Sequence, residues 1–190
     1  MKKAEPMYLT HAREFIAKLD KYLIDPHSRV DVNSSCTRLA KEENIIPRIS
    51  SGMSRTCVIY DDFVVKFDTG NSYYGHSYSE FIGYKNAIRA GYDHLFAPMH
   101  HIKVNNRYYY VMERVSYLAI ECDDYCDYDW CDTDFYDEWV DNHFCDLHDE
   151  NWGFDEEDNP KLIDYAFNDF FIPASRRPHP RKAKKYRYSF

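Results

Sequence analysis

The order of strand-like and helical segments between residues 46 and 115 is the feature that most constrains the fold. Residues 58–60 and 63–67 are two apolar segments rich in β-branched and aromatic residues, and Asp61-Asp62 separates them. Such a pattern is typical of a hairpin. The segment Ser51-Gly-Met-Ser-Arg55 is a turn of mostly small residues that leads into the first of these strands. This part of the chain therefore predicts antiparallel strands.

A helix and a second hairpin are predicted next. Residues 77–90 have apolar side chains at helical spacing, and Gly91 is a residue typical of the position just after a helix. Residues 99–104 and 108–115 have strand-like patterns on either side of the turn Asn105-Asn106. The order of three strands, one helix and two strands predicts a small antiparallel sheet that carries one helix, a fold of the α+β class.

The first 45 residues predict two helices that pack through an apolar stripe. Thr10 is a candidate N-cap for the first helix and Pro26 ends it, while a second, shorter helix is expected from Ser34 or Ser35 to Glu43. The apolar residues of the first helix share one face at helical spacing: Ala12, Phe15, Ile16, Leu19 and Leu23. No chemistry is visible in these elements, which are interpreted as a brace.

A length of 190 residues allows one domain or one small two-lobed unit. Four parts are predicted: an N-terminal helical brace (1–45), a lobe built on the sheet (46–115), a short second lobe (116–172) and a basic C-terminal tail (173–190). No run reaches the length of a membrane span, and residues 1–8 lack the apolar segment of a secretory signal. We therefore expect a cytoplasmic protein without membrane association.

Charge is distributed unevenly along the chain, whose net charge is -8. Residues 121–158 contain 17 Asp or Glu and no Lys or Arg, whereas the segment Arg176–Arg187 contains seven Lys or Arg and no acidic residue. A basic tail is a candidate for nucleic-acid binding. A tail that is solvated, or that folds back on the acidic segment, is the favoured interpretation. Nothing in the sequence defines an oligomeric state.

Four cysteines and two histidines lie close together in the second half of the chain: Cys122, Cys126, Cys131, Cys145, His143 and His148. Their spacing does not form the tight ligand pairs of structural zinc sites. They are interpreted as reduced, buried or half-buried thiols, with a zinc site as the alternative.

Lys66 lies within an apolar strand pattern, between Val65 and Phe67. An ammonium group in such a position is costly without a partner, and Glu80 on the following helix can supply one. A lysine held by a carboxylate is suited to fixing the phosphates of a nucleotide. The pair therefore indicates phosphate chemistry.

A second polar set follows the acidic segment. Asp146 and Asn151 lie on one tight loop, Asp146-Leu-His-Asp-Glu-Asn151, and Asp164 directly follows the apolar pair Leu162-Ile163. One aspartate can orient or deprotonate an attacking hydroxyl, while amide and carboxylate oxygens are ligands that suit magnesium. Together with Lys66, these residues predict magnesium-dependent phosphoryl transfer.

In this order the segments resemble the protein-kinase signature set, over about residues 49–167. The motifs that carry the resemblance are Val-Val-Lys66, Glu80, Tyr110-Val-Met-Glu-Arg-Val115, Asp146-Leu-His-Asp-Glu-Asn151 and Ile163-Asp-Tyr-Ala166. The Asp-Leu-His-x-x-Asn form is similar to the atypical branch, which includes aminoglycoside and choline phosphotransferases and small phage-encoded kinases. The resemblance implies a kinase-like fold with an antiparallel N-lobe and a strongly truncated helical C-lobe.

The resemblance also implies roles for individual residues, with ATP as nucleotide and magnesium as metal. Asp146 would be the catalytic base, Lys66 would touch the phosphates while paired with Glu80, and Asn151 and Asp164 would hold magnesium. The residues expected to contact ATP are Gly52, Ser54, Arg55, Lys66, Met112, Glu113 and Val115.

Several departures from the family bear on function. Gly52 is the only glycine before Lys66, where a glycine-rich loop would be expected, and Tyr165-Ala166 replaces Phe-Gly after Asp164. Only 26 residues follow Asp164, which leaves no room for the helices that dock a protein substrate. Cys145 stands where the family has arginine, so regulation by activation-loop phosphorylation is not expected.

Three functions follow from these residues. The first is a Ser/Thr-kinase-like phosphotransferase of phage or mobile-element type, acting on itself, on an unknown protein substrate or host protein, or on a small molecule. The second is a pseudokinase that serves as a nucleotide-binding or inhibitory interaction module, with its acidic surface as one means of contact. The third is a nucleic-acid binder that uses the tail Arg176–Arg187. Transfer of AMP instead of phosphate is an alternative chemistry for the first.

Overall fold

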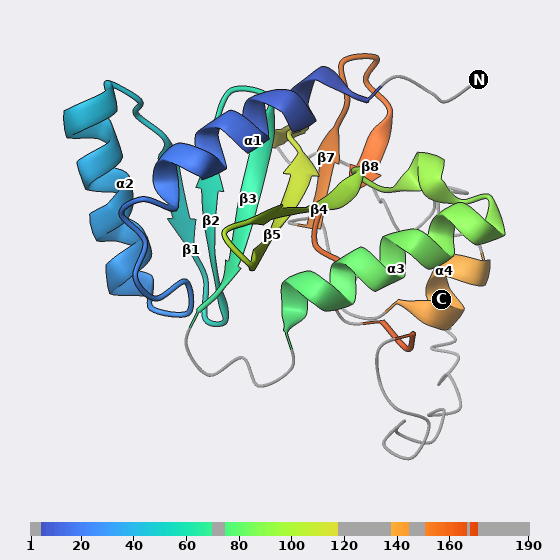
Figure 1. Cartoon of the computed structure of the whole chain (residues 1–190). Helices are drawn as coiled ribbons and strands as arrows, with labels where there is room; N and C mark the ends of the chain where they lie inside the picture. The colour runs from blue at the N-terminus through green and yellow to red at the C-terminus, as the bar shows by residue number, and fades with distance from the viewer. Residues whose placement is uncertain (1–4, 70–74, 118–137, 145–150, 167, 171–190) are drawn as a thin grey trace, which may run out of the picture.

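A five-stranded antiparallel sheet is the centre of the computed structural model, which describes residues 5–69, 75–117, 138–144, 151–166 and 168–170. The strands lie in the order β1-β2-β3-β5-β4 (Figure 1). Their bounds are β1 (Arg48–Ser51), β2 (Arg55–Ile59), β3 (Phe63–Asp68), β4 (Met99–Val104) and β5 (Arg107–Glu113). Helices accompany the sheet, so the fold is mixed α+β, as the sequence predicts.

Both predicted hairpins are confirmed. β2 pairs with β3 across the turn that contains Asp61-Asp62, with Val58 opposite Val65. β4 pairs with β5 across Asn105-Asn106, and these two asparagines adopt φ values of 46° and 65°. Asparagine tolerates this left-handed region better than most residues, and such two-residue turns match the twist of the strands they join.

The first helix, α1 (Met7–Leu19), begins earlier than the predicted cap at Thr10. That prediction was wrong because the buried stripe extends a turn further, to Tyr8 and Leu9. Pro6 occupies the position before the helix, with φ of −56°, a value that proline adopts without cost. The predicted apolar face is confirmed within the helix, where Ala12, Phe15, Ile16 and Leu19 are buried. The helix ends at Leu19 and not at Pro26 as predicted, so Leu23 is buried beyond it.

The second helix, α2 (Arg29–Glu43), also begins earlier than predicted, before Ser34 and Ser35. Its N-cap is Ser28, whose hydroxyl accepts a hydrogen bond from the Asp31 N–H at 3.3 Å. Val32 is buried on the same stripe as Cys36 and Leu39, which lie one and two turns further along the helix. This additional turn of buried contact explains why the helix extends to Arg29.

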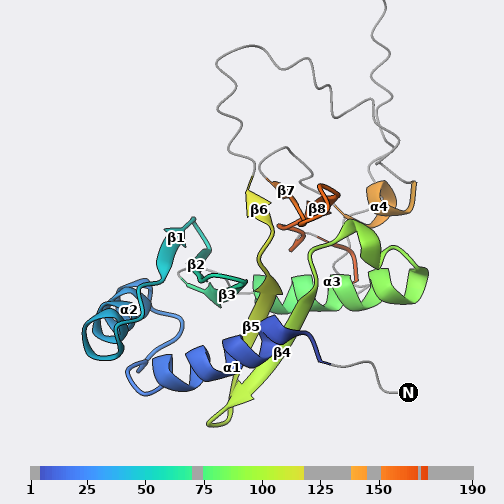
Figure 2. The same cartoon turned by 90° about the horizontal axis from the view of Figure 1, so that it is seen from above.

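The two faces of the sheet are covered by different helices. α1 lies across one face and α3 (His76–Ala90) lies on the other (Figure 2). Val65 and Phe67 of β3 belong to the apolar core that includes α1. Because successive strand residues point to opposite faces, Lys66 between them faces the α3 side.

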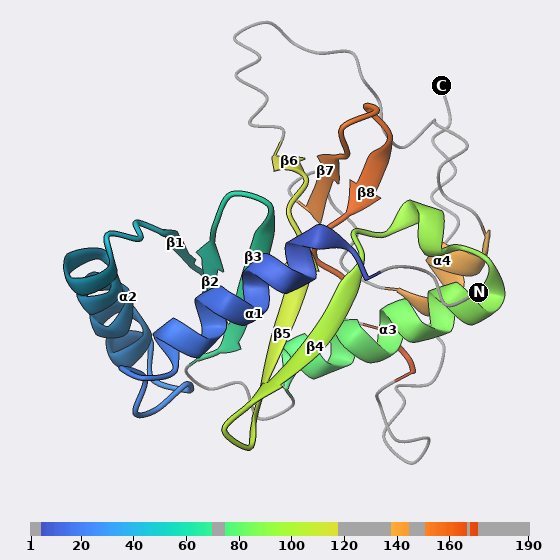
Figure 3. The same cartoon turned by 45° about the horizontal axis from the view of Figure 1, so that its top comes forward.

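The second half of the described chain adds a small sheet and a short helix. β6 (Ser116–Tyr117), β7 (Trp152–Phe154) and β8 (Pro160–Leu162) form it in that order, side by side at one end of the larger sheet (Figure 3). The remaining elements are the 3-10 helix η1 (Asp93–Leu95) and α4 (Glu138–His143). The predicted helix 77–90 with Gly91 after it is confirmed, and Gly91 has φ of 86°. No helix in the described ranges is both long and apolar enough to cross a membrane.

Gly153 lets β7 approach the chain segment that leaves β5. A Cβ added at Gly153 would lie 2.6 Å from Val115 Cγ2 and 2.8 Å from the Ser116 carbonyl oxygen. Side-chain carbons do not reach such distances without displacing a neighbour. Glycine is therefore needed where the small sheet joins the larger one.

Asp20 attaches the end of α1 to the β4–β5 hairpin. Its carboxylate accepts hydrogen bonds from the Tyr109 hydroxyl, from Asn105 Nδ2 at 2.8 Å and from Arg107 Nη1 at 3.2 Å. Arg107 also donates to the Leu23 carbonyl at 2.6 Å. The N-terminal helices are thus joined to the sheet by a polar network as well as by the shared apolar core.

Candidate functional site

Lys66 lies at the centre of the sheet, and its ammonium is fully engaged. Nζ donates to the two carboxylate oxygens of Glu80 at 3.0 and 2.9 Å and to the Ile163 carbonyl at 2.7 Å. Lys66 is 6% exposed and Glu80 is completely buried. The ion pair expected from the sequence is therefore present. All three donors of the ammonium have an acceptor.

The Glu80 carboxylate has two further partners besides Lys66. Its Oε1 accepts a hydrogen bond from the Tyr165 N–H at 3.2 Å and lies 2.7 Å from Arg55 Nη1. A buried carboxylate is stable only when it is paired and hydrogen-bonded. Glu80 meets both requirements through partners on β3, on β2 and in the segment after β8.

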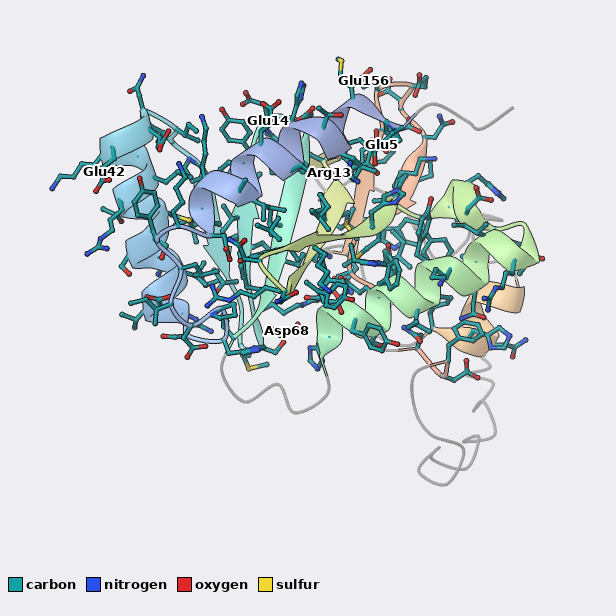
Figure 4. The ribbon with its side chains drawn as sticks, viewed as in Figure 1. Glu5, Arg13, Glu14, Glu42, Asp68 and Glu156 are labelled. Atoms are coloured by element: carbon teal, nitrogen blue, oxygen red, sulfur yellow. The ribbon has the colours of Figure 1, made fainter. Side chains whose placement is uncertain are left out.

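The position of Glu80 depends on how α3 begins. Gly75 precedes the helix and offers no side-chain cap. Instead, the Asp68 carboxylate at the end of β3 accepts hydrogen bonds from Ser77 N at 2.9 Å and Ser77 Oγ at 2.8 Å. Figure 4 shows Asp68 beside the start of α3. This cap joins the strand of Lys66 to the helix of Glu80, so it sets the distance between the two.

Arg55 completes a quartet of charges with Lys66, Glu80 and Asp164. Its side chain is 11% exposed and forms ion pairs with Glu80 and Asp164. Burial alone would lower the pKa of Arg55, but the two carboxylates raise it above its ordinary value. Two positive and two negative side chains thus balance one another at the junction of β2, β3, α3 and the segment after β8.

Asp164 is the most accessible member of the quartet, with a side chain 39% exposed. Burial would raise its pKa, but Arg55 and then Lys66 lower it below the ordinary value, so the carboxylate is ionised. Asn151 is 6% exposed, and its backbone carbonyl accepts a hydrogen bond from the Ile163 N–H at 2.7 Å. The two predicted magnesium ligands therefore come from neighbouring chain segments.

The turn between β1 and β2 lies beside the quartet and is held from several sides. Gly52 N–H donates to the Arg55 carbonyl at 3.0 Å, and Ser54 Oγ lies 3.0 Å from His76 Nδ1. Arg29 of α2 donates to the Gly52 carbonyl. No atom lies within 4 Å of a Cβ added at Gly52, so local packing does not require glycine there. The sequence predicted Gly52, Ser54 and Arg55 as nucleotide contacts but did not indicate Arg29 or His76.

Three of the residues expected to contact ATP lie at the end of β5 or just after it: Met112, Glu113 and Val115. Met112 is 2% exposed and belongs to the core on the α3 side of the sheet. Glu113 is half-buried, and its N–H donates to the Pro98 carbonyl at 3.0 Å. Burial, and then Glu156, raise the pKa of Glu113. Val115 is partly buried against the same core, so this segment is rigidly positioned where the two sheets meet.

Several predicted residues lie outside the described residues. They are Asp146, Cys122, Cys126, Cys131, Cys145, His148 and the basic tail Arg176–Arg187. His143 is described, and its Nδ1 lies 3.0 Å from Asp169 Oδ1. Within the described part of the chain, no group of three or more His, Cys, Asp or Glu side chains is arranged to hold a metal ion.

Asn151 and Asp164 are nevertheless the kind of donors that magnesium requires, since the ion also keeps several waters and binds substrate phosphates. Asp164 is ionised and partly accessible, which fits the metal. One of its oxygens is paired with Arg55, so a metal would share or replace that contact. The residues therefore fit magnesium, with Arg55 either sharing Asp164 or releasing it.

No family model matches the chain, and no curated protein or solved structure matches it either. The functional argument therefore depends on the chemistry of the quartet and of the elements around it.

Proposed function

We propose that this chain is an ATP- and magnesium-dependent phosphotransferase with a kinase-like fold. The observation that carries the proposal is the buried pair of Lys66 and Glu80 with Asp164 beside it, contributed by a strand, a helix and the segment after a small hairpin. A lysine fixed by a carboxylate, next to an accessible aspartate, is the set of charges that kinase-like phosphoryl transfer uses.

The order of elements supports the same proposal. The helix that carries Glu80 is inserted between β3 and β4, and the end of β5 leads directly into the small sheet β6-β7-β8. Ile163 and Asp164 follow β8, and the Ile163 carbonyl is bound by Lys66. This arrangement agrees with the motif order that resembles the protein-kinase signature set.

In the proposed reaction, a hydroxyl oxygen of the acceptor attacks the γ-phosphorus of ATP. The bond from that phosphorus to the β,γ-bridging oxygen breaks, ADP leaves with the electron pair, and Asp146 takes the hydroxyl proton. Magnesium, held by Asn151 and Asp164, would supply positive charge next to the phosphates. Lys66 and Glu80 keep the sheet and helix in the geometry that orients the nucleotide.

The proposal is tested by a thermal-shift titration with ATP, with and without magnesium, on the wild type and on Asp164→Ala. A ligand that binds only the folded chain raises the melting temperature as its concentration increases. We expect a magnesium-dependent increase for the wild type that is lost in Asp164→Ala. Labelled phosphate should then reach an acceptor, and Asp146→Asn should abolish that transfer without affecting ATP binding. No shift for the wild type at millimolar ATP would contradict the proposal.

The ion pair of Arg55 with Asp164 favours a second candidate, a pseudokinase-like module that binds nucleotide or a partner without transfer. In that case the Asp164 carboxylate is satisfied by Arg55 and has no need of a metal. ATP binding that is independent of magnesium and is followed by no phosphate transfer, in the wild type and in Asp146→Asn alike, would select this candidate.

A further inference from the structure

The two cations of the quartet differ in how many of their donors are engaged. The three donors of Lys66 are directed at Glu80 and at the Ile163 carbonyl. Arg55 has five donors, and its buried Nη1 makes no aligned hydrogen bond within the described part of the chain, although it lies 2.7 Å from Glu80 Oε1. Arg55 also contacts the accessible Asp164 through Nη2, whereas the donors of Lys66 are all directed elsewhere.

The two anions also differ, in how strongly they depend on Arg55. Glu80 has two contacts with Lys66 and one with the Tyr165 N–H that do not involve Arg55. Asp164 has a side chain 39% exposed, so water screens its ion pair with Arg55, and water-screened ion pairs contribute little to stability. The contact between Arg55 and Asp164 is therefore the one that can exchange at low cost.

The backbone around Arg55 is held by hydrogen bonds that do not involve the Arg55 side chain. The Arg55 carbonyl accepts a hydrogen bond from Gly52 N, and Thr69 N donates to the Ser54 carbonyl, both at 3.0 Å. These bonds tie the turn to the sheet on both sides of Arg55. A change of partner then requires only rotation of the Arg55 side chain, which is fast compared with movement of the loop.

We infer that Arg55, and not Lys66, is the cation that first binds the triphosphate, by leaving Asp164 for the phosphate oxygens. The inference rests on the proposed function and names how the nucleotide enters that site. A guanidinium offers a planar fork that matches phosphate oxygens. Its departure also frees the Asp164 carboxylate for the metal. Throughout the exchange, Glu80 keeps its ion pair with Lys66.

The test is a double-mutant cycle of ATP affinity in EDTA, where no metal can bind. Calorimetry is performed on the wild type, Asp164→Asn, Arg55→Gln and the double variant. Because Asp164 competes with phosphate for Arg55, we expect Asp164→Asn to tighten metal-free ATP binding about three- to fivefold, the value of a screened ion pair. Arg55→Gln should weaken binding about tenfold or more. In the Arg55→Gln background, Asp164→Asn should bring no gain.

An equal gain from Asp164→Asn in both backgrounds would overturn the inference, because the effect would then be general repulsion between a carboxylate and ATP. That result leaves the proposed function standing. If no variant binds ATP, even with magnesium, the proposed function fails and the exchange fails with it.

Two controls separate binding from folding. Arg13→Gln removes an exposed arginine that pairs with Glu5 and with no carboxylate of the quartet, and it should leave ATP affinity unchanged. Arg55→Lys keeps the charge, and a folded Arg55→Lys protein should bind metal-free ATP more tightly than Arg55→Gln. Equal affinities for these two folded variants would also count against the inference.

Discussion

Glu80 offers the most direct test of how the quartet contributes to stability. Its carboxylate is completely buried and faces two cations, Lys66 and Arg55. In Glu80→Gln the side chain keeps its size, but the two cations lose their buried counter-charge. Removing one partner of a buried ion pair costs about 3–5 kcal/mol of unfolding free energy. For a chain of this length, each kcal/mol lowers the melting temperature by about 2–4 °C. The expected decrease is therefore about 6–20 °C.

Urea denaturation followed by circular dichroism measures the change in unfolding free energy, and an unchanged slope shows that the unfolded state is the same. The matched control is Glu5→Gln. Glu5 pairs with Arg13 along α1 (Figure 4), where the two side chains are 43% and 53% exposed, so its loss should cost less than about 1 kcal/mol. A loss for Glu80→Gln no larger than that of the control would refute the reasoning.

Two further predictions concern acid stability and helix packing. Burial would raise the pKa of Asp164, but Arg55 and Lys66 hold it below its ordinary value in the folded chain. Its contribution to stability is therefore present above the ordinary pKa of an aspartate and is lost as the pH falls through the folded pKa. Asp164→Asn should accordingly flatten the decline of unfolding free energy with falling pH, measured by urea denaturation in the acidic range. A Cβ at Gly83 in α3 would lie 2.9 Å from the side-chain nitrogen of the buried Asn168, so Gly83→Ala should lower the unfolding free energy measured by urea denaturation by about 1–3 kcal/mol. Gly52→Ala is the control, because no atom lies within 4 Å of a Cβ at that position and packing should not be disturbed.

Local sequence signals were sufficient for much of the sheet. The β4–β5 hairpin depends on Asn105-Asn106 and on strand patterns beside them, all within a few residues. Gly91 likewise marks the end of α3 because only a local requirement, φ of 86°, has to be met. Such features are readable because the residues that cause them are neighbours in sequence.

The starts of the N-terminal helices were not readable in the same way. Thr10 and Ser34 are acceptable cap residues, and nothing local distinguishes them from Ser28, which forms the actual cap of α2. The choice is made by burial of Val32 in the core and of Tyr8 against the sheet. Tertiary packing therefore overrode the local preference at both helices.

At the site, the sequence predicted the pair of Lys66 and Glu80 because an ammonium inside an apolar strand demands a carboxylate. Arg55 carried no such signal: it follows a turn of mostly small residues, where an exposed arginine would be ordinary. Its contact with Asp164 joins residues 109 positions apart and exists only because β2 and the segment after β8 meet at Glu80. In the folded chain, all three donors of Lys66 are directed at Glu80 and at the Ile163 carbonyl. The sequence predicted both Lys66 and Arg55 as nucleotide contacts, but not that all donors of Lys66 would be directed at Glu80 and Ile163 while Arg55 pairs with Asp164.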